Sequence, residues 1–132
     1  MNKKLVEVVA AVIENENNEI LCALRSPIMT LPNMWEFPGG KVEEGESLYT
    51  AIEREIKEEL KCSIKAIEII GENRHENEKI IVNLTAIKCN LVEGEPVADE
   101  HSKLIYLNKE NLESLVWAPA DIPLVKKVIN IK

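Results

Sequence analysis

Three glutamates, Glu55, Glu58 and Glu59, have a spacing that could bind a metal ion. At about 100° of rotation per residue, a helix would place the three carboxylates within one arc of roughly 100°. Carboxylates gathered in this way repel one another unless a cation offsets their charge. Hard oxygen ligands suit Mg²⁺ or Mn²⁺, and Mg²⁺ typically keeps positions open for water and substrate phosphates. The spacing therefore indicates a divalent metal site.

A helix expected from Ser47, a plausible N-cap, to about Lys61 must position these carboxylates. Its rotation puts apolar residues on one side (Leu48, Ile52 and Ile56) and a solvent-facing group on the other (Thr50, Glu53, Lys57 and Lys61). The three glutamates then lie along the edge of the apolar stripe, away from the solvent face. A solvated, salt-bridged face is the alternative for such a charge run. Arg54 could neutralise one carboxylate, but hardly all three.

The segment at 39–62, GGKVEEGESLYTAIEREIKEELKC, resembles the Nudix box, G-x5-E-x7-R-E-U-x-E-E-x-G-U, in which U is a bulky apolar residue. The residues that match at the required spacing are Gly40, Glu46, Arg54, Glu55, Ile56, Glu58 and Glu59. Lys61 stands where Gly usually ends the helix in a left-handed turn, and Cys62 replaces the last apolar residue. WEFPGG, GEPVADE and APADIPLV also look like the MutT-like branch, and most like bacterial CTP or 5-methyl-dCTP pyrophosphohydrolases.

This resemblance implies a hydrolase that converts a nucleoside triphosphate and water into the monophosphate and pyrophosphate, with Mg²⁺ or Mn²⁺ as cofactor. It implies a set of metal ligands: Glu55, Glu58, Glu59 and the Gly39 carbonyl. Glu55 is also the leading candidate to orient or deprotonate the attacking water. Glu100 stands where MutT-like enzymes carry a loop carboxylate that binds metal or acts as base, although a loop glutamate is usually solvated. Glu46 and Arg54 would support the site, with Glu46 capping the helix or pairing with Arg54.

Five residues are candidates for substrate contact: Arg25, Trp35, Lys79, Trp117 and Asp121. Arg25 ends a strand where the family often has a substrate-contacting arginine, and an ordinary surface role is the alternative; for Lys79 a surface role is favoured. One tryptophan could stack on a base, while core packing is the default for both. The resemblance implies that Asp121 reads a base edge, for which cytosine N4 is a suitable donor; alternatively Asp121 caps the last helix.

The remaining elements predict an α+β fold, an α/β/α sandwich in which helices pack on a mixed β-sheet, as in the Nudix fold. Strands are expected over 4–13, 19–24, 64–72, 79–91 and 102–107, a long loop over 25–40, and helices over 47–61, 109–115 and 121–130. One domain over residues 1–132 accounts for the whole length.

Composition limits the partners and the compartment. The net charge of −7 argues against binding to nucleic acid or to anionic membranes, and a polyphosphate substrate would then need a bridging cation. We expect no signal peptide and no membrane span. Three widely spaced cysteines, Cys22, Cys62 and Cys89, indicate free thiols in a reducing cytoplasm. The sequence leaves open whether the protein is a monomer or a homodimer.

Two other functions remain open. A Nudix enzyme for a nucleoside diphosphate sugar or a dinucleotide often carries an extra N-terminal region or dimerises by swapping, and this chain begins almost directly with its first strand. A non-catalytic nucleotide-binding module should have lost a metal carboxylate, and none is missing here. The sequence does not decide which base, which sugar, or whether a damaged nucleotide is preferred.

Overall fold

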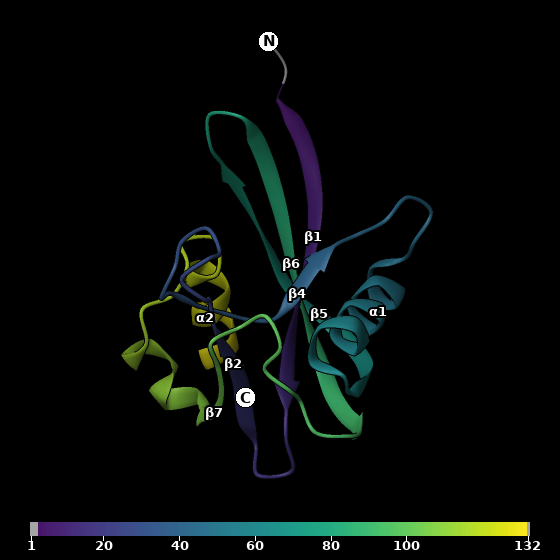
Figure 1. Ribbon diagram of the computed structural model, residues 1–132, viewed down its shortest axis with the longest axis vertical. Helices are drawn as coiled ribbons and strands as arrows, with labels where there is room; N and C mark the ends of the chain where they lie inside the picture. Colours follow the sequence, from purple (N-terminus) through teal and green to yellow (C-terminus); the bar gives the residue numbers. More distant parts are fainter. Residues whose placement is uncertain (1–2, 132) are drawn as a thin grey trace.

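The computed structural model describes residues 3–131, so both ends of the predicted 1–132 domain lie outside the described residues. The elements in chain order are β1 (Lys4–Glu14), β2 (Glu19–Leu24), β3 (Trp35–Glu36), β4 (Gly39–Lys41), α1 (Leu48–Leu60), β5 (Ser63–Glu76), β6 (Ile80–Glu93), β7 (Lys103–Asn108), the 3₁₀ helix η1 (Lys109–Ser114) and α2 (Ile122–Ile129). The predicted mixed sheet flanked by helices is confirmed (Figure 1). No helix within 3–131 is long and apolar enough to cross a membrane.

The seven-stranded sheet is built around β1, which pairs with β6 in parallel along its whole length. β5 is antiparallel to β6 and forms one edge of the sheet. The other edge of β1 is divided between β2, which pairs at Glu14, and β4, which pairs at 8–10. β2 then pairs with β3 and β7 instead. Because two strands share one edge of β1, the sheet divides there, and the cavity described below opens beside β4.

Both faces of the sheet are covered, which explains the almost uninterrupted apolar run of β1. Val9, Ala11 and Ile13 pack with α1 on one face. Ala10 and Val12 point to the opposite face and pack with α2 and η1. Figure 1 shows the two α-helices on opposite sides of the sheet. The side chains of β1 alternate between the two cores with the period of two that a strand imposes.

Helix α1 begins and ends through local contacts. The Ser47 hydroxyl accepts a hydrogen bond from Thr50 N at 3.1 Å, which confirms the predicted N-cap. Lys61 ends the helix in the left-handed conformation, with φ 58°, and its backbone N–H bonds Lys57 O at 3.2 Å. Lys61 therefore adopts the conformation that the expected glycine would favour, and the helix still ends at that position.

Several sequence-based boundaries were wrong. The 25–40 loop contains β3 and β4, which are too short to show a periodic pattern. β5 continues to Glu76, so that only 77–79 remain for the turn to β6. The helix expected at 109–115 is a 3₁₀ helix. Glu53, expected on the solvent face of α1, is half-buried and accepts a hydrogen bond from Ala66 N of β5 at 2.9 Å.

Candidate active site

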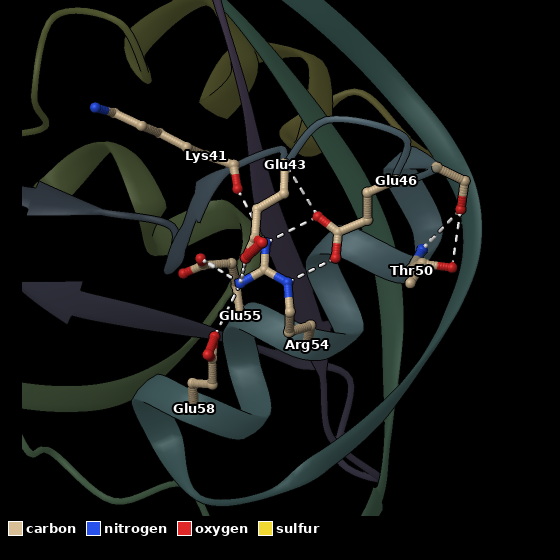
Figure 2. Close-up of polar contacts among 8 residues, drawn as sticks. Lys41, Glu43, Glu46, Thr50, Arg54, Glu55 and Glu58 are labelled. Carbon is tan, nitrogen blue, oxygen red and sulfur yellow. Dashed lines mark hydrogen bonds and ion pairs between the residues drawn. The ribbon is translucent and has the colours of Figure 1, made fainter.

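Arg54 holds together the carboxylates around the start of α1. It binds Glu46 at two points, Nε to Oε2 at 2.6 Å and Nη2 to Oε1 at 2.9 Å. Its Nη1 lies 2.9 Å from Glu55 Oε1 and 2.8 Å from Glu58 Oε1, with Glu43 Oε1 at 3.4 Å (Figure 2). Arg54 thus pairs with two of the three metal-site glutamates, more than the one expected but not all three, because its planar guanidinium presents several donors at once.

The two candidate roles of Glu46 are resolved in favour of pairing. Besides Arg54, Glu46 accepts a hydrogen bond from Glu43 N at 3.0 Å through Oε1, while Ser47 caps the helix. The hydrogen bond to Arg54, reinforced by the one from Glu43 N, lowers the pKa of Glu46 to about 2. Glu46 therefore stays ionised at neutral pH and fixes the turn before α1 to the helix.

The three glutamates of the predicted metal site differ in exposure. The side chain of Glu58 is 60% exposed, that of Glu55 20% and that of Glu59 16%. Burial raises the pKa of Glu59 to about 7, the charge of His101 opposes this, and the charge of Glu55 adds to it. Glu59 Oε2 is buried and has no hydrogen-bond partner. Within 3–131, no three or more His, Cys, Asp or Glu side chains converge closely enough to hold an ion as they stand.

The two glycines of β4 permit the close approach of α1 and β1. A Cβ on Gly40 would lie 2.2 Å from Glu55 Oε2, and one on Gly39 would lie 1.9 Å from Val9 O. Only glycine leaves space for the Glu55 carboxylate over β4 and for β4 against β1. The Nudix-box Gly40 thus allows the Glu55 carboxylate its position over β4, whereas an added Cβ at Gly39 would meet backbone atoms of β1.

A buried chain of polar contacts runs from Glu59 to Arg25. His101 Nε2 lies 2.7 Å from Glu36 Oε2, and His101 Nδ1 lies 3.8 Å from Glu59 Oε1. Glu36 Oε1 accepts a hydrogen bond from Arg25 Nη1 at 2.5 Å. Burial disfavours the charged imidazole, but the hydrogen bond and the charge of Glu36 hold the pKa of His101 above its usual value. Arg25 also binds Thr30 O and Oγ1, so its guanidinium is engaged within the protein.

A cavity of about 430 Å³ adjoins these groups, within the size range of small-molecule sites. Its lining includes Gly39 and Gly40 of β4, the polar residues Glu59, Arg25, Glu36 and Asp121, and the apolar residues Phe37, Met29 and Leu31. The structure thus brings the predicted residues Gly39, Glu59, Arg25 and Asp121 to one cavity.

Asp121 is a buried carboxyl in the wall of this cavity. It is 5% exposed, and its Oδ2 accepts a hydrogen bond from Phe37 N at 3.0 Å. Burial raises the pKa of Asp121 to about 7, against the effect of the Phe37 N–H. Although Asp121 occupies the N-cap position of α2, its side chain makes no capping bond there, so the predicted capping role was wrong. Asp121 Oδ2 accepts the Phe37 N–H instead.

Seven other candidates are not among the residues that line the cavity: Arg54, Glu55 and Glu58 on α1, and Trp35, Trp117, Lys79 and Glu100. Trp117 is 6% exposed, packs against Phe37 with ring centroids 4.8 Å apart, and donates its indole N–H to Leu112 O. Trp35 is half-buried and bridges Trp117 through its backbone. Neither tryptophan lines the cavity, so the stacking hypothesis has no support, and core packing accounts for Trp117. Lys79 lies on the exposed β5–β6 turn, and Glu100 is an exposed residue of the segment before β7.

The donor set fits a divalent cation. Glu55, Glu58 and Glu59 supply hard oxygens, one of which, Glu59 Oε2, is buried without a partner. Arg54 Nη1 occupies the position between Glu55 and Glu58 and neutralises them in this structure. Glu55 and Glu58 would therefore exchange their contact with Arg54 for an ion, while the two-point pair of Arg54 with Glu46 holds the guanidinium nearby.

Comparison with known proteins gives the same family. The NUDIX domain model matches residues 4–128, and the chain belongs to this family and is a Nudix hydrolase. The CTP pyrophosphohydrolase of Escherichia coli K12 is 36% identical over 129 residues, which cover 98% of this chain and 95% of that protein. An 8-oxo-dGTP diphosphatase of Haemophilus influenzae is 28% identical over 130 residues, covering 98% and 96%. The chain is 46% identical to a MutT protein of the Nudix hydrolase family from methicillin-resistant Staphylococcus aureus 252. The solution structure of that protein matches this fold with a TM-score of 0.80, and the match covers 97% of this chain and 98% of that one.

Two polar residues of the site, Glu36 and His101, were missed in the sequence. Glu36 lies within WEFPGG and His101 directly follows Glu100, so both adjoin segments already singled out. A lone histidine and a glutamate 65 residues apart carry no common pattern, and the pairing of β3 and β7 with β2 brings them together. The signal in the sequence was their position beside candidate residues.

Proposed function

We propose that this protein is a metal-dependent nucleoside triphosphate pyrophosphohydrolase that uses Mg²⁺, or Mn²⁺ in its place, and prefers a cytosine nucleotide. The observation that carries the proposal is one cavity lined by Glu59, by Gly39 and Gly40 of β4, and by the buried carboxyl of Asp121. A triphosphate and a base could then be held in one cavity. Its relatives, a CTP pyrophosphohydrolase and an 8-oxo-dGTP diphosphatase, support this substrate class.

In this proposal Glu55, Glu58, Glu59 and the Gly39 carbonyl hold the cation. Bound there, Mg²⁺ would neutralise phosphate charge and lower the pKa of a coordinated water. Glu55 accepts the proton of the attacking water, since its carboxylate lies against Gly40, which lines the cavity. Water adds to phosphorus, the bond to the bridging oxygen breaks, and pyrophosphate leaves. Glu100 is the alternative base, because its charge is near enough to raise the pKa of Glu59.

Asp121 is proposed as the reader of the base. Its Oδ2 is held by Phe37 N, which fixes the carboxyl plane. A carboxyl oxygen accepts a hydrogen bond from an exocyclic amine such as cytosine N4. Arg25 is paired with Glu36, so it would contact substrate only through N–H groups that are not already bonded within the protein. The three free buried thiols fit a protein of the reducing cytoplasm.

The test is a pyrophosphate-release screen with Mg²⁺ over canonical and modified NTPs and dNTPs. Wild type is compared with Glu58→Gln, and with Glu68→Gln as an exposed control on β5. Turnover of a cytosine nucleotide that is lost in Glu58→Gln and kept in Glu68→Gln is the expected result. Asp121→Asn should lower kcat/KM for that nucleotide about 10–100-fold and change guanine nucleotides less, because one base-edge contact discriminates by about 1–3 kcal/mol.

Other outcomes decide between the alternatives. Cleavage of a nucleoside diphosphate sugar or a dinucleotide, without cleavage of any triphosphate, would agree with the Nudix family and reject the proposed substrate class. Nucleotide binding without any hydrolysis by wild type would favour a binding module. Equal loss of cytosine and guanine turnover in Asp121→Asn would reject Asp121 as the base reader.

A further inference from the structure

The His101 side chain connects two carboxylates of the cavity wall from behind. It is 1% exposed and does not line the cavity, whereas its neighbours Glu36 and Glu59 do. Its Nε2 lies 2.7 Å from Glu36 Oε2, and its Nδ1 lies 3.8 Å from Glu59 Oε1. The imidazole is therefore placed where it can fix one carboxylate relative to the other without touching substrate.

The hydrogen bond to Glu36 fixes the orientation of the ring. Because a carboxylate only accepts hydrogen bonds, His101 Nε2 must donate to Glu36. Nδ1 is then the ring atom that faces Glu59. Both His101 Nδ1 and Glu59 Oε2 are buried and have no hydrogen-bond partner. Buried polar atoms are rarely left unpaired, and two in adjacent side chains indicate a polar arrangement that another group completes.

The backbone around His101 is held at both ends of the same segment. Val97 N donates to Leu60 O, at the end of α1, at 2.8 Å. Ser102 N donates to Leu24 O, at the end of β2, at 2.9 Å. The segment between β6 and β7, which carries His101, is thus bonded to the helix that carries Glu59 and to the strand that leads into Arg25. An arrangement fixed at both ends can hold a side chain to the tolerance that ion binding needs.

We propose that His101 is a positioning residue for Glu59: anchored by Glu36, the imidazole faces Glu59 Oε1 with Nδ1 at 3.8 Å and confines the carboxylate to the orientation that leaves Oε2 free to bind a divalent cation. This rests on the proposed function only in assuming that Glu59 is a metal ligand. Residues that orient metal ligands typically contribute 10–100-fold to metal affinity. His101 itself contacts neither metal nor substrate.

Two substitutions separate the two ring nitrogens. His101→Gln retains a polar group near the position of Nε2 and removes the one near Nδ1, while His101→Asn does the reverse. The measurement is Mn²⁺ affinity, from the electron paramagnetic resonance signal of free Mn²⁺ at one fixed pH and without nucleotide. Thr85→Val controls for disturbance of the core: it replaces a buried hydroxyl of the sheet, which has no hydrogen-bond partner, with an isosteric methyl.

We expect His101→Gln to weaken Mn²⁺ binding about 10–100-fold, at least threefold more than His101→Asn, with Thr85→Val unchanged. Thermal unfolding of each variant confirms that it is folded. Mn²⁺ affinity within twofold of wild type in both His101 variants, or an equal loss in both, would overturn the proposal, because a purely structural histidine has no such asymmetry. Absence of Mn²⁺ binding by wild type would also overturn it. If wild type binds Mn²⁺ but cleaves no nucleoside triphosphate, the proposed function fails, and the Mn²⁺ comparison still decides the role of His101.

Discussion

Arg54 and Glu46 are joined at two points, by Nε to Oε2 at 2.6 Å and by Nη2 to Oε1 at 2.9 Å. Eight residues separate them, so this pair connects the turn before α1 to the second turn of the helix. The same guanidinium contacts Glu55 and Glu58 through Nη1. The position of Glu46 therefore determines where Arg54 meets the carboxylates of the candidate metal site.

Glu46→Gln is expected to lower kcat/KM about 10–100-fold, because an amide cannot form the charged two-point pair that orients Arg54. It should also destabilise the fold in a pH-dependent way. The folded pKa of Glu46 is lowered to about 2, so its stabilisation is present above the unfolded value of 4.5 and is lost as the pH falls towards 2. Urea unfolding of both proteins should show a difference at pH 7 that shrinks at pH 3.

Glu44→Gln is the control, since Glu44 is exposed in the same turn. It should leave both activity and the pH dependence of stability as in wild type. A stability difference between wild type and Glu46→Gln that is the same at both pH values would show that the pair with Arg54 is not what lowers this pKa.

Glu59→Gln is expected to remove activity while making the metal-free protein more stable. Burial raises the folded pKa of Glu59 to about 7, so the folded state binds this proton more tightly than the unfolded state. Wild-type stability relative to the variant should therefore fall as the pH rises from about 4.5 to 7 and then level off. The gain from the substitution at pH 8 is up to about 3 kcal/mol.

The measurement is chemical unfolding at pH 5 and pH 8 with a chelator present. Glu58→Gln is the matched comparison: Glu58 is 60% exposed, so this variant should lose activity without becoming more stable. A Glu59→Gln protein that is less stable than wild type at pH 8 would contradict the view that Glu59 is held at the site at a cost in stability.

Gly40→Ala is expected to lower kcat at least tenfold. Its Cβ would lie 2.2 Å from Glu55 Oε2, so the carboxylate must move from its position over β4. Gly45→Ala is the contrasting variant, because Gly45 has a φ of 81° and no neighbour within 4 Å of an added Cβ. It should lose about 1–2 kcal/mol of stability through backbone strain and retain activity. Steady-state kinetics and thermal unfolding distinguish the two, and wild-type kcat in Gly40→Ala would exclude a steric control of Glu55.

The helix and its carboxylates were predictable because local signals agreed. Ser47 caps the helix, Ile52 and Ile56 are fully buried, and the Nudix-box spacing located Glu46 and Arg54 correctly relative to each other. Helical periodicity needs only the residues of the helix itself. The expectation that Glu58 lies away from the solvent face was wrong, because its exposure depends on what covers that end of α1.

The cavity could not be predicted in the same way. Asp121 and Phe37 are 84 residues apart. Nothing in the segment APADIP shows that the Asp121 carboxylate will accept a hydrogen bond from the Phe37 backbone instead of capping α2. Stacking stayed open for Trp117 beside core packing, the default, until its contacts with Phe37 and Leu112 were known. His101 and Glu36 became neighbours only through the pairing of β7 and β3 with β2. Each of these depends on tertiary contacts that leave no periodic trace in the sequence.

Lys61→Gly is expected to stabilise the protein by about 0.5–1 kcal/mol and leave activity unchanged. Lys61 ends α1 with φ 58°, a left-handed conformation that costs roughly 1 kcal/mol for a residue with a Cβ and little for glycine. The substitution removes a hydrogen bond from Lys61 Nζ to Glu58 O and a 3.8 Å contact with Asp99, both exposed and of small value. Lys57→Gly, within the same helix, should instead destabilise by about 1 kcal/mol. Urea unfolding of the two variants at neutral pH makes the comparison, and destabilisation by both would mean that the Lys61 side chain contributes more through its contacts than its backbone conformation costs.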